Sequence, residues 1–518
     1  MIIKTFRYSF ILSVVALGCS KTPTTKPELY GEPHRLQFHF SPPQGWMNDP
    51  NGLVYYDNTY HLFYQHYPDS NIWGPMHWGH AASADLVHWK NLPIALYPDS
   101  LGYIFSGSAV IDESNTTGFQ HGNEKPLVAI FTYHDIVKEK AGRIDRESQG
   151  IAYSNDKGNT WIKYRGNPVL KNKGDKDFRD PKVFFHSASK RWIMPLAVGN
   201  HLEIFSSGNL KEWTKESEFG DNEGSHGGTW ECPDLFPLTT PDGKEKWVLI
   251  QNMDRGSVNG GSGTQYFIGH FDGKTFRNDN EPTKTLWLDY GADNYAGVTW
   301  FGAPGDRRIF IGWMSNWDDY AALVPTQGWR SAMTIPREIS LVNTADGLRV
   351  SQLPIDELRR LRGEKTGATQ TQFTDSLVIS TTNVEKELDL EFDLSKSTST
   401  SLGFSLSNSM NEKVIVGYDQ TKNEVFVDRT ASGTTDFSKK FPKRHTAPYK
   451  TNGVLKVHAF IDNSSVEIFV DDGVIVMTEL FFPTEDYTKV TVFNHGGTAE
   501  LLKADIYALQ SIWKNEIR

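Results

Sequence analysis

Hydrophobic and polar residues alternate in short runs over most of the chain, and these runs occur in pairs. Residues 53–56 pair with 61–64 in this sense, residues 182–185 with 192–194, and a further run covers 247–250. A period of two is typical of β-strands, and no convincing amphipathic helix interrupts this region. The pattern therefore predicts an all-β fold.

A degenerate repeat separates the paired runs. Three segments share a serine, a polar turn and a tryptophan, and a fourth is a looser copy: residues 83–89, 154–161, 206–213 and 270–276. We expect each segment to join two strands. Strand pairs that recur every roughly 50 to 70 residues with aromatic residues in their turns predict a β-propeller, in which radial repetition protects the sheet edges.

The pattern changes near residue 345. Residues 355–362 are predicted to form a short helical link, and cleanly alternating strands follow at residues 388–394, 414–418, 425–427, 457–461 and 466–470. Asp471, Asp472 and Gly473 supply a hairpin turn. This spacing predicts a β-sandwich. The sandwich carries few candidate catalytic clusters, so structural support is favoured over auxiliary sugar binding.

The amino terminus has the features of an export signal. Lys4 and Arg7 precede an apolar stretch at residues 10–17, which is too short to span a bilayer but has the size of a signal-peptide core. The following Gly18 and Cys19 complete a likeness to a bacterial lipoprotein box, so Cys19 is the expected lipidation site. The expected location is the bacterial cell envelope, at the outer membrane or the periplasmic face, with secretion as the alternative. Membrane contact is expected only through this anchor.

Five segments follow from these patterns. They are a signal peptide at 1–19, a tether at 20–33, a β-propeller at 34–345, a linker at 346–364 and a β-sandwich at 365–518. No apolar run elsewhere is long enough to cross a bilayer, so we expect a soluble globular protein. Cys232 is the only cysteine besides Cys19, which argues against a disulfide framework.

Composition narrows the partners. The formal net charge is −10 and no basic tract is present, so a nucleic-acid partner is disfavoured. Aromatic residues make up 13% of the chain. Most are expected in the β core, but planar rings also pack against the apolar faces of sugars. A neutral substrate therefore fits better than a charged one.

Three short acidic motifs carry the candidate chemistry. They lie at residues 46–52 (Trp-Met-Asn-Asp-Pro-Asn-Gly), 178–181 (Phe-Arg-Asp-Pro) and 230–234 (Trp-Glu-Cys-Pro-Asp). Cleavage of a glycosidic bond needs one ionised carboxylate and one protonated carboxyl group. The chain offers such a set.

Each acid also has a plainer interpretation. Asp49 lies in a segment that, taken alone, predicts an ordinary turn. Asp180 follows Arg179, which would help to keep it ionised if the two side chains faced each other, and a surface ion pair is the competing view. Glu231 lies between apolar residues that would favour its neutral form by desolvation, and buried structural glutamates are rare.

Further blocks accompany the acidic motifs in a fixed order, at residues 63–65, 73–80, 105–108 and 329–338. Together the blocks resemble glycoside hydrolase family 32, the fructofuranosidases that include invertases, levanases and inulinases. The resemblance extends from about His34 to the carboxyl end. It implies a five-bladed β-propeller with a central funnel followed by a β-sandwich, in agreement with the strand pattern.

The resemblance also implies a role for each acid. Asp49 is the expected nucleophile, Glu231 the general acid/base, and Asp180 the residue that stabilises the transition state through sugar hydroxyls. Such an enzyme retains the anomeric configuration, and the Asp49 and Glu231 carboxyl groups should then lie roughly 5 to 5.5 Å apart. Arg179 is expected to orient Asp180 or to grip a fructose hydroxyl.

The terminal sugar would occupy a pocket between these acids. Its expected lining residues are Asn48, Gln65, Trp73, Phe105 and Ser106, with Asp293 and Trp313 as further wall candidates. No metal-ligand cluster or nucleotide-binding loop is evident, so no metal and no cofactor are implied.

Polymer-active members of the family tend to carry Trp-Glu-Cys-Pro at the third motif and a tract like that at residues 312–317. We therefore favour release of terminal fructose from levan or inulin, with sucrose as a further substrate. An endo-acting fructanase and a fructosyltransferase are the enzymatic alternatives. A non-catalytic cell-surface fructan-binding protein would keep an aromatic pocket, but the presence of all three acids speaks against it. The sequence does not indicate an oligomeric state.

Overall fold

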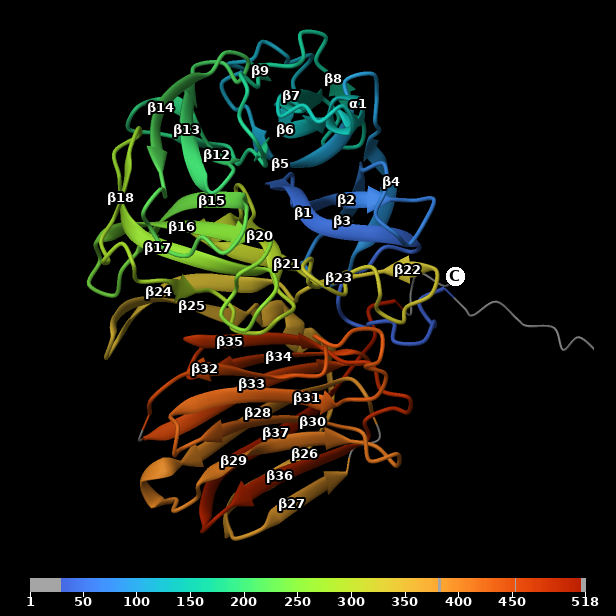
Figure 1. Ribbon diagram of the computed structural model, residues 1–518, viewed down its shortest axis with the longest axis vertical. Helices are drawn as coiled ribbons and strands as arrows, with labels where there is room; N and C mark the ends of the chain where they lie inside the picture. The colour runs from blue at the N-terminus through green and yellow to red at the C-terminus, as the bar shows by residue number, and fades with distance from the viewer. Residues whose placement is uncertain (1–28, 381–382, 452, 514–518) are drawn as a thin grey trace, which may run out of the picture.

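The computed structural model describes residues 29–380, 383–451 and 453–513 (Figure 1). Within these ranges the chain forms seven β-sheets, a single short α-helix and a few 3₁₀ turns. Five sheets make a propeller and two make a sandwich that packs beneath it in the view of Figure 1. The prediction of an all-β propeller followed by a sandwich is confirmed.

Each propeller blade is an antiparallel sheet built largely from consecutive strands. The first blade contains β1 (Gly45–Tyr56), β2 (Thr59–Tyr67), β3 (His77–Ser83), β4 (Lys90–Leu96) and β22 (Trp329–Arg330). The second contains β5 (Tyr103–Ile111), β6 (Leu127–His134), β7 (Glu147–Ser154), β8 (Ile162–Lys163) and β9 (Leu170–Lys171), with α1 (Ile136–Lys140) between β6 and β7.

The remaining blades follow the same plan. The third contains β10 (Phe178–Arg179), β11 (Phe184–His186), β12 (Arg191–Val198), β13 (His201–Ser207) and β14 (Thr214–Phe219). The fourth contains β15 (Trp230–Thr239), β16 (Glu245–Met253), β17 (Gly263–Phe271), β18 (Phe276–Asn278) and β19 (Leu286–Trp287). The fifth contains β20 (Tyr295–Thr299), β21 (Ile309–Met314), β23 (Ala332–Met333), β24 (Arg337–Thr344) and β25 (Gly347–Pro354), with a 3₁₀ turn at Pro304–Asp306.

The predicted serine and tryptophan repeat has a clear structural role. Its first three copies connect the third and fourth strands of the first three blades. In each copy the serine hydroxyl accepts a backbone N–H from the turn, at 3.1 Å for Ser83, 2.9 Å for Ser154 and 2.9 Å for Ser207. These bonds satisfy polar groups that the strand ladder leaves open.

The ring closes between the first and fifth blades. The short strand β22 leaves the fifth blade and pairs in parallel with β1, where Gly45 lies opposite Trp329. An isolated parallel bridge between Val54 and Phe301 makes a second link. The blades are thus held in a closed ring without an open sheet edge at the junction.

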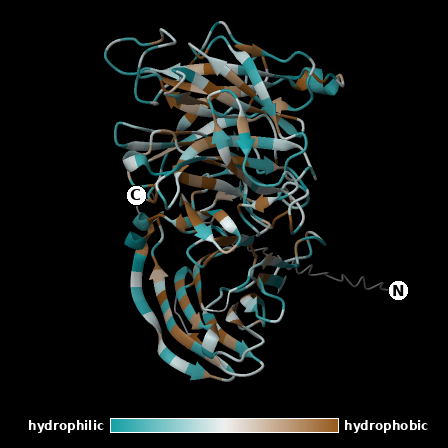
Figure 2. Cartoon of the chain, turned by 90° about the vertical axis from the view of Figure 1, so that its left-hand side faces the viewer, coloured by the Kyte–Doolittle hydropathy of each residue, from teal (hydrophilic) through white to brown (hydrophobic). Residues whose placement is uncertain are grey.

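The sandwich consists of two antiparallel six-stranded sheets. One contains β26 (Arg362–Phe373), β28 (Lys386–Asp393), β33 (Val454–Asp462), β34 (Ser465–Val470), β35 (Ile475–Leu480) and β37 (Ala499–Leu509). The other contains β27 (Ser376–Ser380), β29 (Ser401–Ser407), β30 (Lys413–Asp419), β31 (Glu424–Ala431), β32 (Arg444–Pro448) and β36 (Lys489–His495), and a 3₁₀ turn lies at Leu394–Lys396. Alternating hydrophilic and hydrophobic residues are visible along its strands in Figure 2. The hydrophobic set forms one core between the sheets.

The boundary between the domains differs from the prediction. The fifth blade continues to Pro354, so a boundary at residue 345 would cut the hairpin of β24 and β25. The predicted helical link is a 3₁₀ helix at Asp356–Leu361, and β26 begins directly after it. Residues 347–354 belong to the propeller because β25 pairs with β24, and this pairing is not visible in the sequence pattern.

Buried ion pairs join the two domains. His39, just before β1, contacts Asp462 at 2.7 Å through Nδ1 and Glu467 at 2.9 Å through Nε2. Burial alone would lower the pKa of His39, but the two carboxylates outweigh it and raise that pKa to about 9. Arg337 of the propeller also pairs with Glu467 and lies 3.0 Å from Asp289. Charged groups of both domains are therefore matched inside the interface.

In the described part of the chain, no helix combines the length and the apolar character that crossing a membrane requires. The predicted signal peptide, most of the tether and Cys19 lie outside the described residues.

Candidate active site

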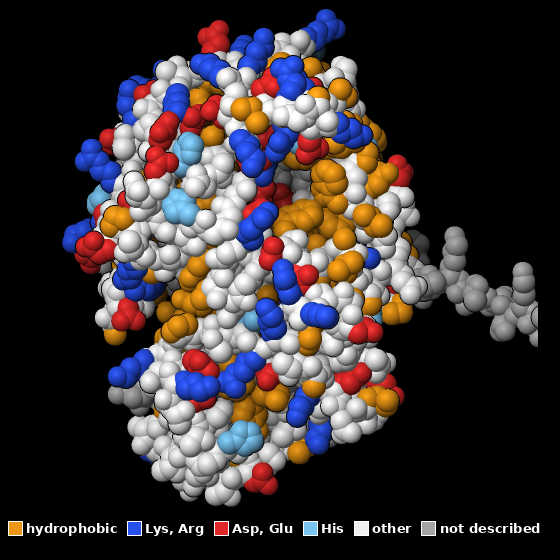
Figure 3. All heavy atoms as spheres, in the orientation of Figure 1, with side chains coloured by type: hydrophobic (Ala, Val, Ile, Leu, Met, Phe, Trp, Pro, Cys, Tyr) orange, Lys and Arg blue, Asp and Glu red, His pale blue; other side chains and the backbone are white. Residues whose placement is uncertain are grey.

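The first strand of each blade carries a residue that lines one pocket or, in the fifth blade, contacts a residue that lines it. The contributing residues on β1, β5, β10, β15 and β20 are Asp49, Ser106, Arg179, Glu231 and Tyr295, and Asp180 follows β10 directly. Acidic side chains lie in a hollow of the propeller beside a broad hydrophobic area (Figure 3). The three acidic motifs, far apart in sequence, thus meet at one end of the ring.

Irregularities in these strands aim the side chains inward. In four blades the register with the second strand slips where a pocket residue occurs: between Met47 and Pro50, Ile104 and Gly107, Glu231 and Asp234, and Tyr295 and Val298. A β-bulge rotates the backbone and redirects a side chain. In the third blade Asp180 itself has a positive φ of 66°. Gly107 allows its bulge because a Cβ atom there would lie 2.0 Å from the Ile130 carbonyl oxygen.

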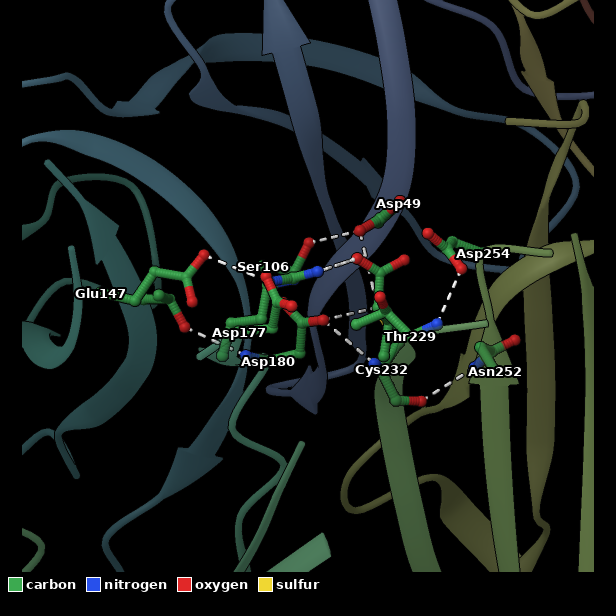
Figure 4. A network of polar contacts seen from close by, with 12 residues as sticks. Asp49, Ser106, Glu147, Asp177, Asp180, Thr229, Cys232, Asn252 and Asp254 are labelled. Atoms are coloured by element: carbon green, nitrogen blue, oxygen red, sulfur yellow. Dashed lines mark hydrogen bonds and ion pairs between the residues drawn. The ribbon is translucent and has the colours of Figure 1, made fainter. Parts of the chain in front are cut away.

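Cys232 lies between two of the acids. Its Sγ is 3.5 Å from Oδ2 of Asp49 and 3.6 Å from Oδ2 of Asp180, and its backbone N–H donates to the same Asp180 oxygen at 3.1 Å (Figure 4). Because Glu231 precedes Cys232 in the chain, all three carboxyl groups lie around one small volume.

Asp49 is held by two donors on opposite oxygens. The Ser106 hydroxyl donates to Oδ2 at 2.6 Å, and the Asn48 amide donates to Oδ1 at 3.0 Å. Asn48 is itself oriented, because its Oδ1 accepts the Trp46 indole N–H at 2.7 Å. These two donors fix the orientation of the Asp49 carboxyl group in the pocket.

Glu231 has a different environment. Arg179 donates to its Oε1 from Nε at 3.0 Å and from Nη2 at 2.7 Å, while the Tyr295 hydroxyl bonds Oε2. Burial raises the pKa of Glu231, Arg179 and Tyr295 act in the opposite direction, and the charge of Asp49 adds to the rise. The net upward shift of this pKa favours the protonated form that a general acid needs.

Among the described residues, Arg179 makes no hydrogen bond to Asp180, so the first of its two predicted roles lacks the expected contact, and the second, binding of a fructose hydroxyl, stays a prediction. Its hydrogen bonds go instead to Glu231, Glu147 and Asp177. Burial raises the pKa of Asp180 well above its usual value; Arg179 opposes this rise, whereas the nearby Glu231 and Asp49 carboxylates increase it.

The acids line a pocket of about 240 Å³. The predicted pocket residues that line it are Asn48, Asp49, Gln65, Trp73, Phe105, Ser106, Arg179, Asp180 and Glu231. Trp73 is 36% exposed and meets Phe105 edge to face, with ring centroids 6.1 Å apart. Gln65 is buried, and its amide donates to Asn51 at 2.7 Å, which leaves its carbonyl oxygen oriented. The pocket therefore combines an aromatic wall with a polar base.

Asp293 is not in the pocket, contrary to the prediction. It is fully buried and pairs with Arg429 of the sandwich, accepts the Tyr320 hydroxyl at 2.7 Å and accepts the Leu480 backbone N–H at 2.8 Å. A buried carboxylate needs such partners to offset desolvation. Asp293 therefore joins the domains rather than binding the substrate.

Trp313 is also displaced from its predicted place. It is completely buried and lies behind Trp317, with ring centroids 4.9 Å apart, and beside Trp46 at 6.2 Å. Trp317, four positions along the same segment, lines the pocket instead. Strand β21 ends at Met314, so the chain turns before it presents a ring to the cavity.

Several lining residues were not predicted. His134, Glu139, Arg146, Glu147 and Trp317 line the cavity, and Tyr295 contacts Glu231. Trp317 ends the aromatic tract at residues 312–317, and Tyr295 lies two residues after Asp293, a predicted wall candidate. The other four lie around the β6–β7 connection, where no motif marked them.

A different cluster has geometry that is compatible with a metal ion. Among the described residues, His201, Glu203 and Glu218 place potential ligand atoms within 4.8 Å of one another. They lie on β13 and β14, apart from the catalytic pocket. The Lys215 ammonium group already pairs with both glutamates. This lysine supplies the positive charge that the two acids require.

Two family models cover nearly the whole described chain. The N-terminal domain model of glycosyl hydrolases family 32 matches residues 39–354, and the C-terminal model matches residues 357–508.

Known proteins resemble the chain over most of its length. A levanase of Bacillus subtilis is 47% identical over 493 residues, which cover 93% of this chain and 72% of the relative. An extracellular exo-inulinase of Aspergillus awamori is 38% identical, with 93% and 96% covered. The crystal structure of the A. awamori exo-inulinase superposes with a TM-score of 0.86 at 37% identity, covering 93% of this chain and 100% of that one. A β-fructofuranosidase of Schwanniomyces occidentalis, complexed with fructosyl-erythritol, gives 0.84 at 31% identity, with 93% and 99% covered.

Proposed function

The chain belongs to glycosyl hydrolase family 32 and is a glycosidase of the β-fructofuranosidase type, and we propose that it releases terminal fructose from β-fructans with retention of configuration. The observation that carries this proposal is the convergence of Asp49, Asp180 and Glu231 in one pocket with contrasting surroundings. The first is held by neutral donors, and the other two have raised pKa values.

In the first step, an Asp49 oxygen attacks the anomeric carbon of the terminal fructose. The bond between this carbon and the glycosidic oxygen breaks as Glu231 transfers its proton to that oxygen. The products are a covalent fructosyl ester of Asp49 and a free leaving sugar. For this geometry we expect the two carboxyl groups to lie roughly 5 to 5.5 Å apart.

In the second step, water enters where the leaving sugar was bound. Glu231, now ionised, accepts a proton from the water while the water oxygen attacks the anomeric carbon. The ester bond breaks, Asp49 is regenerated and fructose leaves. Two displacements at one carbon restore the original configuration.

Asp180 binds hydroxyl groups of the same fructose unit in this proposal. Its Oδ2 already accepts the Cys232 N–H at 3.1 Å, which leaves Oδ1 available for a sugar hydroxyl. Charge builds on the ring as the glycosidic bond breaks, and a carboxyl group against the hydroxyls stabilises that charge.

We propose levan or inulin as the main substrate, with sucrose also cleaved. Two relatives are named a levanase and an exo-inulinase. The acids lie in a compact pocket beside the partly exposed rings of Trp73, Phe105 and Trp317, and this shape favours a chain end over an internal unit.

Product analysis tests the substrate and the mode of cleavage. Sucrose, inulin and levan are offered separately, and the earliest products are separated by anion-exchange chromatography. Fructose as the sole early product is expected; early oligomers would show endo action, and products longer than the substrate would show transfer. Asp49→Ala is the matched control and should lose all turnover while keeping its thermal transition. Equal hydrolysis by this variant would overturn the nucleophile assignment.

We further propose that the protein is exported and anchored by lipid on Cys19. The exo-inulinase relative is described as extracellular, and the lipoprotein-like segment at residues 16–19 supports the anchor. Mass spectrometry of the amino-terminal peptide from membrane fractions should find a diacylglyceryl group on Cys19, and Cys19→Ser should release the enzyme from the membrane fraction. An unmodified Cys19 in a membrane-bound enzyme would exclude this anchor.

A further inference from the structure

Two further acids, Glu147 and Asp177, which are labelled in Figure 4, accept hydrogen bonds from Nη1 of Arg179, whereas Glu231 is bound through Nε and Nη2. Glu147 begins β7, and its side chain is 1% exposed. Its Oε2 accepts the Phe178 backbone N–H at 2.7 Å, and its Oε1 lies 3.2 Å from Nη1 of Arg179 and 3.3 Å from Nδ1 of His134. One carboxylate thus holds both the backbone and the side chain of the segment that carries Arg179.

The guanidinium group of Arg179 divides its donors between two directions. Nε and Nη2 point to Oε1 of Glu231, whereas Nη1 points to Glu147 and Asp177. A guanidinium is a planar, rigid fork, so fixing one nitrogen fixes the direction of the other two. The position of Glu147 therefore determines how Arg179 meets Glu231.

Glu147 and Asp177 differ in the cations that pair with them. Asp177 pairs with a second cation, because Arg146 donates to it at 2.7 Å. Arg146 is 3.9 Å from Glu147, so Arg179 is the closer of the two arginines to the Glu147 carboxylate. Loss of the Glu147 charge would leave more of the Arg179 charge to act on Glu231.

The two oxygens of Glu231 are not equivalent in this arrangement. Oε1 accepts two N–H groups from a cation and is a poor site for a proton. Oε2 faces the Tyr295 hydroxyl, which can donate to an ionised oxygen or accept from a protonated one. Burial raises the pKa of Tyr295 well above its usual value, so this hydroxyl stays neutral.

We propose that Glu147 is a positioning residue for hydrolysis, which holds Arg179 on Oε1 of Glu231 and thereby leaves Oε2 to carry the proton that is transferred. This inference rests on the proposed function, because it assigns Glu231 the role of general acid. Glu147 acts through Arg179 and need not touch the substrate.

Glu147→Gln is the main test. A single amide cannot accept from both Phe178 and Arg179 with its two ends, since one end becomes an NH₂ donor. With a negative charge removed, the pKa of Glu231 falls, and the alkaline limb of kcat/KM for sucrose is expected to move to lower pH by about one unit. We expect kcat to fall more than tenfold, with KM changed less than threefold.

The leaving group provides an independent readout. A nitrophenyl β-fructofuranoside releases a stable phenolate and needs little proton donation. Glu147→Gln should therefore lose less than threefold in kcat/KM on this substrate and at least tenfold on sucrose. Glu203→Gln is the matched control, because Glu203 is another buried propeller acid, paired with Lys215 outside the pocket. It should shift neither the alkaline limb nor the ratio between the two substrates.

Glu147→Asp is the second variant. It keeps the charge but is too short to reach both Phe178 and Arg179, so the alkaline limb should stay in place while the selective loss on sucrose persists. Equal losses on both substrates, or failure of both Glu147 variants to fold, would overturn the proposal and leave Glu147 a structural role. If the wild-type enzyme itself released no fructose from sucrose, inulin or levan, the proposed function would fail instead.

Discussion

The buried His39 bridge predicts a pH-dependent loss of stability that one substitution should remove. His39 of the propeller segment lies between Asp462 and Glu467 of the sandwich and is fully buried. Its pKa is raised from 6.5 to about 9 by these carboxylates. A histidine whose pKa is higher in the folded state than in the unfolded state makes its whole contribution to stability at pH values below the unfolded-state pKa. This contribution is lost as the pH rises through the folded value.

The magnitude follows from the shift. Each pKa unit corresponds to about 1.4 kcal/mol, so a rise from 6.5 to about 9 contributes roughly 3 kcal/mol to the free energy of unfolding at pH 6. Between pH 6.5 and 9 this contribution declines. Asp462 and Glu467 keep other donors, including the backbone N–H of Phe38 at 3.0 Å and of Ile335 at 2.8 Å, so the carboxylates stay partnered.

Urea unfolding followed by tryptophan fluorescence measures the effect. The wild-type protein and His39→Gln are compared at pH 6 and at pH 9.5, and the quantity of interest is the difference between the two pH dependences. We expect the variant to have a lower free energy of unfolding than the wild-type protein at pH 6. This difference should shrink by roughly 3 kcal/mol at pH 9.5. If the difference in free energy of unfolding between the two proteins changes by less than about 0.5 kcal/mol from pH 6 to pH 9.5, the charged-bridge reasoning is refuted.

Three further substitutions test other parts of the structure. Trp73→Ala removes a partly exposed ring from the pocket wall and should raise KM for sucrose roughly two- to tenfold in steady-state kinetics, with kcat nearly unchanged; a loss confined to kcat would contradict a binding role. Ser106→Ala removes the hydroxyl that donates to Asp49 at 2.6 Å. It should lower kcat/KM roughly ten- to hundredfold for both sucrose and nitrophenyl fructoside. A loss on only one of these substrates would argue against a role of Ser106 in holding Asp49. Arg429→Met leaves the buried Asp293 carboxylate without its cation and should lower the free energy of unfolding, measured in urea, by about 3–5 kcal/mol. Asp293→Asn in the same background should recover part of this loss. An unchanged urea midpoint for Arg429→Met would contradict the proposed domain junction.

Much of the fold could be predicted because its information is local. Strand alternation recurs in every blade and the serine-tryptophan turn in the first three, and each is a property of a short window. The domain boundary was less accessible, since only the pairing of β25 with β24 assigns this strand to the propeller. Pairing between strands is not visible in a period-two pattern.

The site divides in the same way. Asp49, Asp180 and Glu231 lie in distinctive motifs, so they could be predicted as site residues from the sequence. Whether Trp313 or Trp317 faces the cavity depends on where β21 ends, which the aromatic segment alone does not reveal.

Long-range contacts were the least predictable feature. Glu147 contacts a residue 32 positions later, and Asp293 pairs with an arginine 136 positions away in the other domain. Neither partner is suggested by the neighbouring residues. Such contacts become visible only when the chain is folded.

The segment that leads into β1 determines how mechanical load reaches the enzyme. Tyr30 stacks on Trp513 at 3.8 Å, and the backbone N–H groups of Gln37 and Phe38 donate to Asp462. A pull on the amino terminus is therefore taken up at the seam between the domains before any tension reaches the first blade.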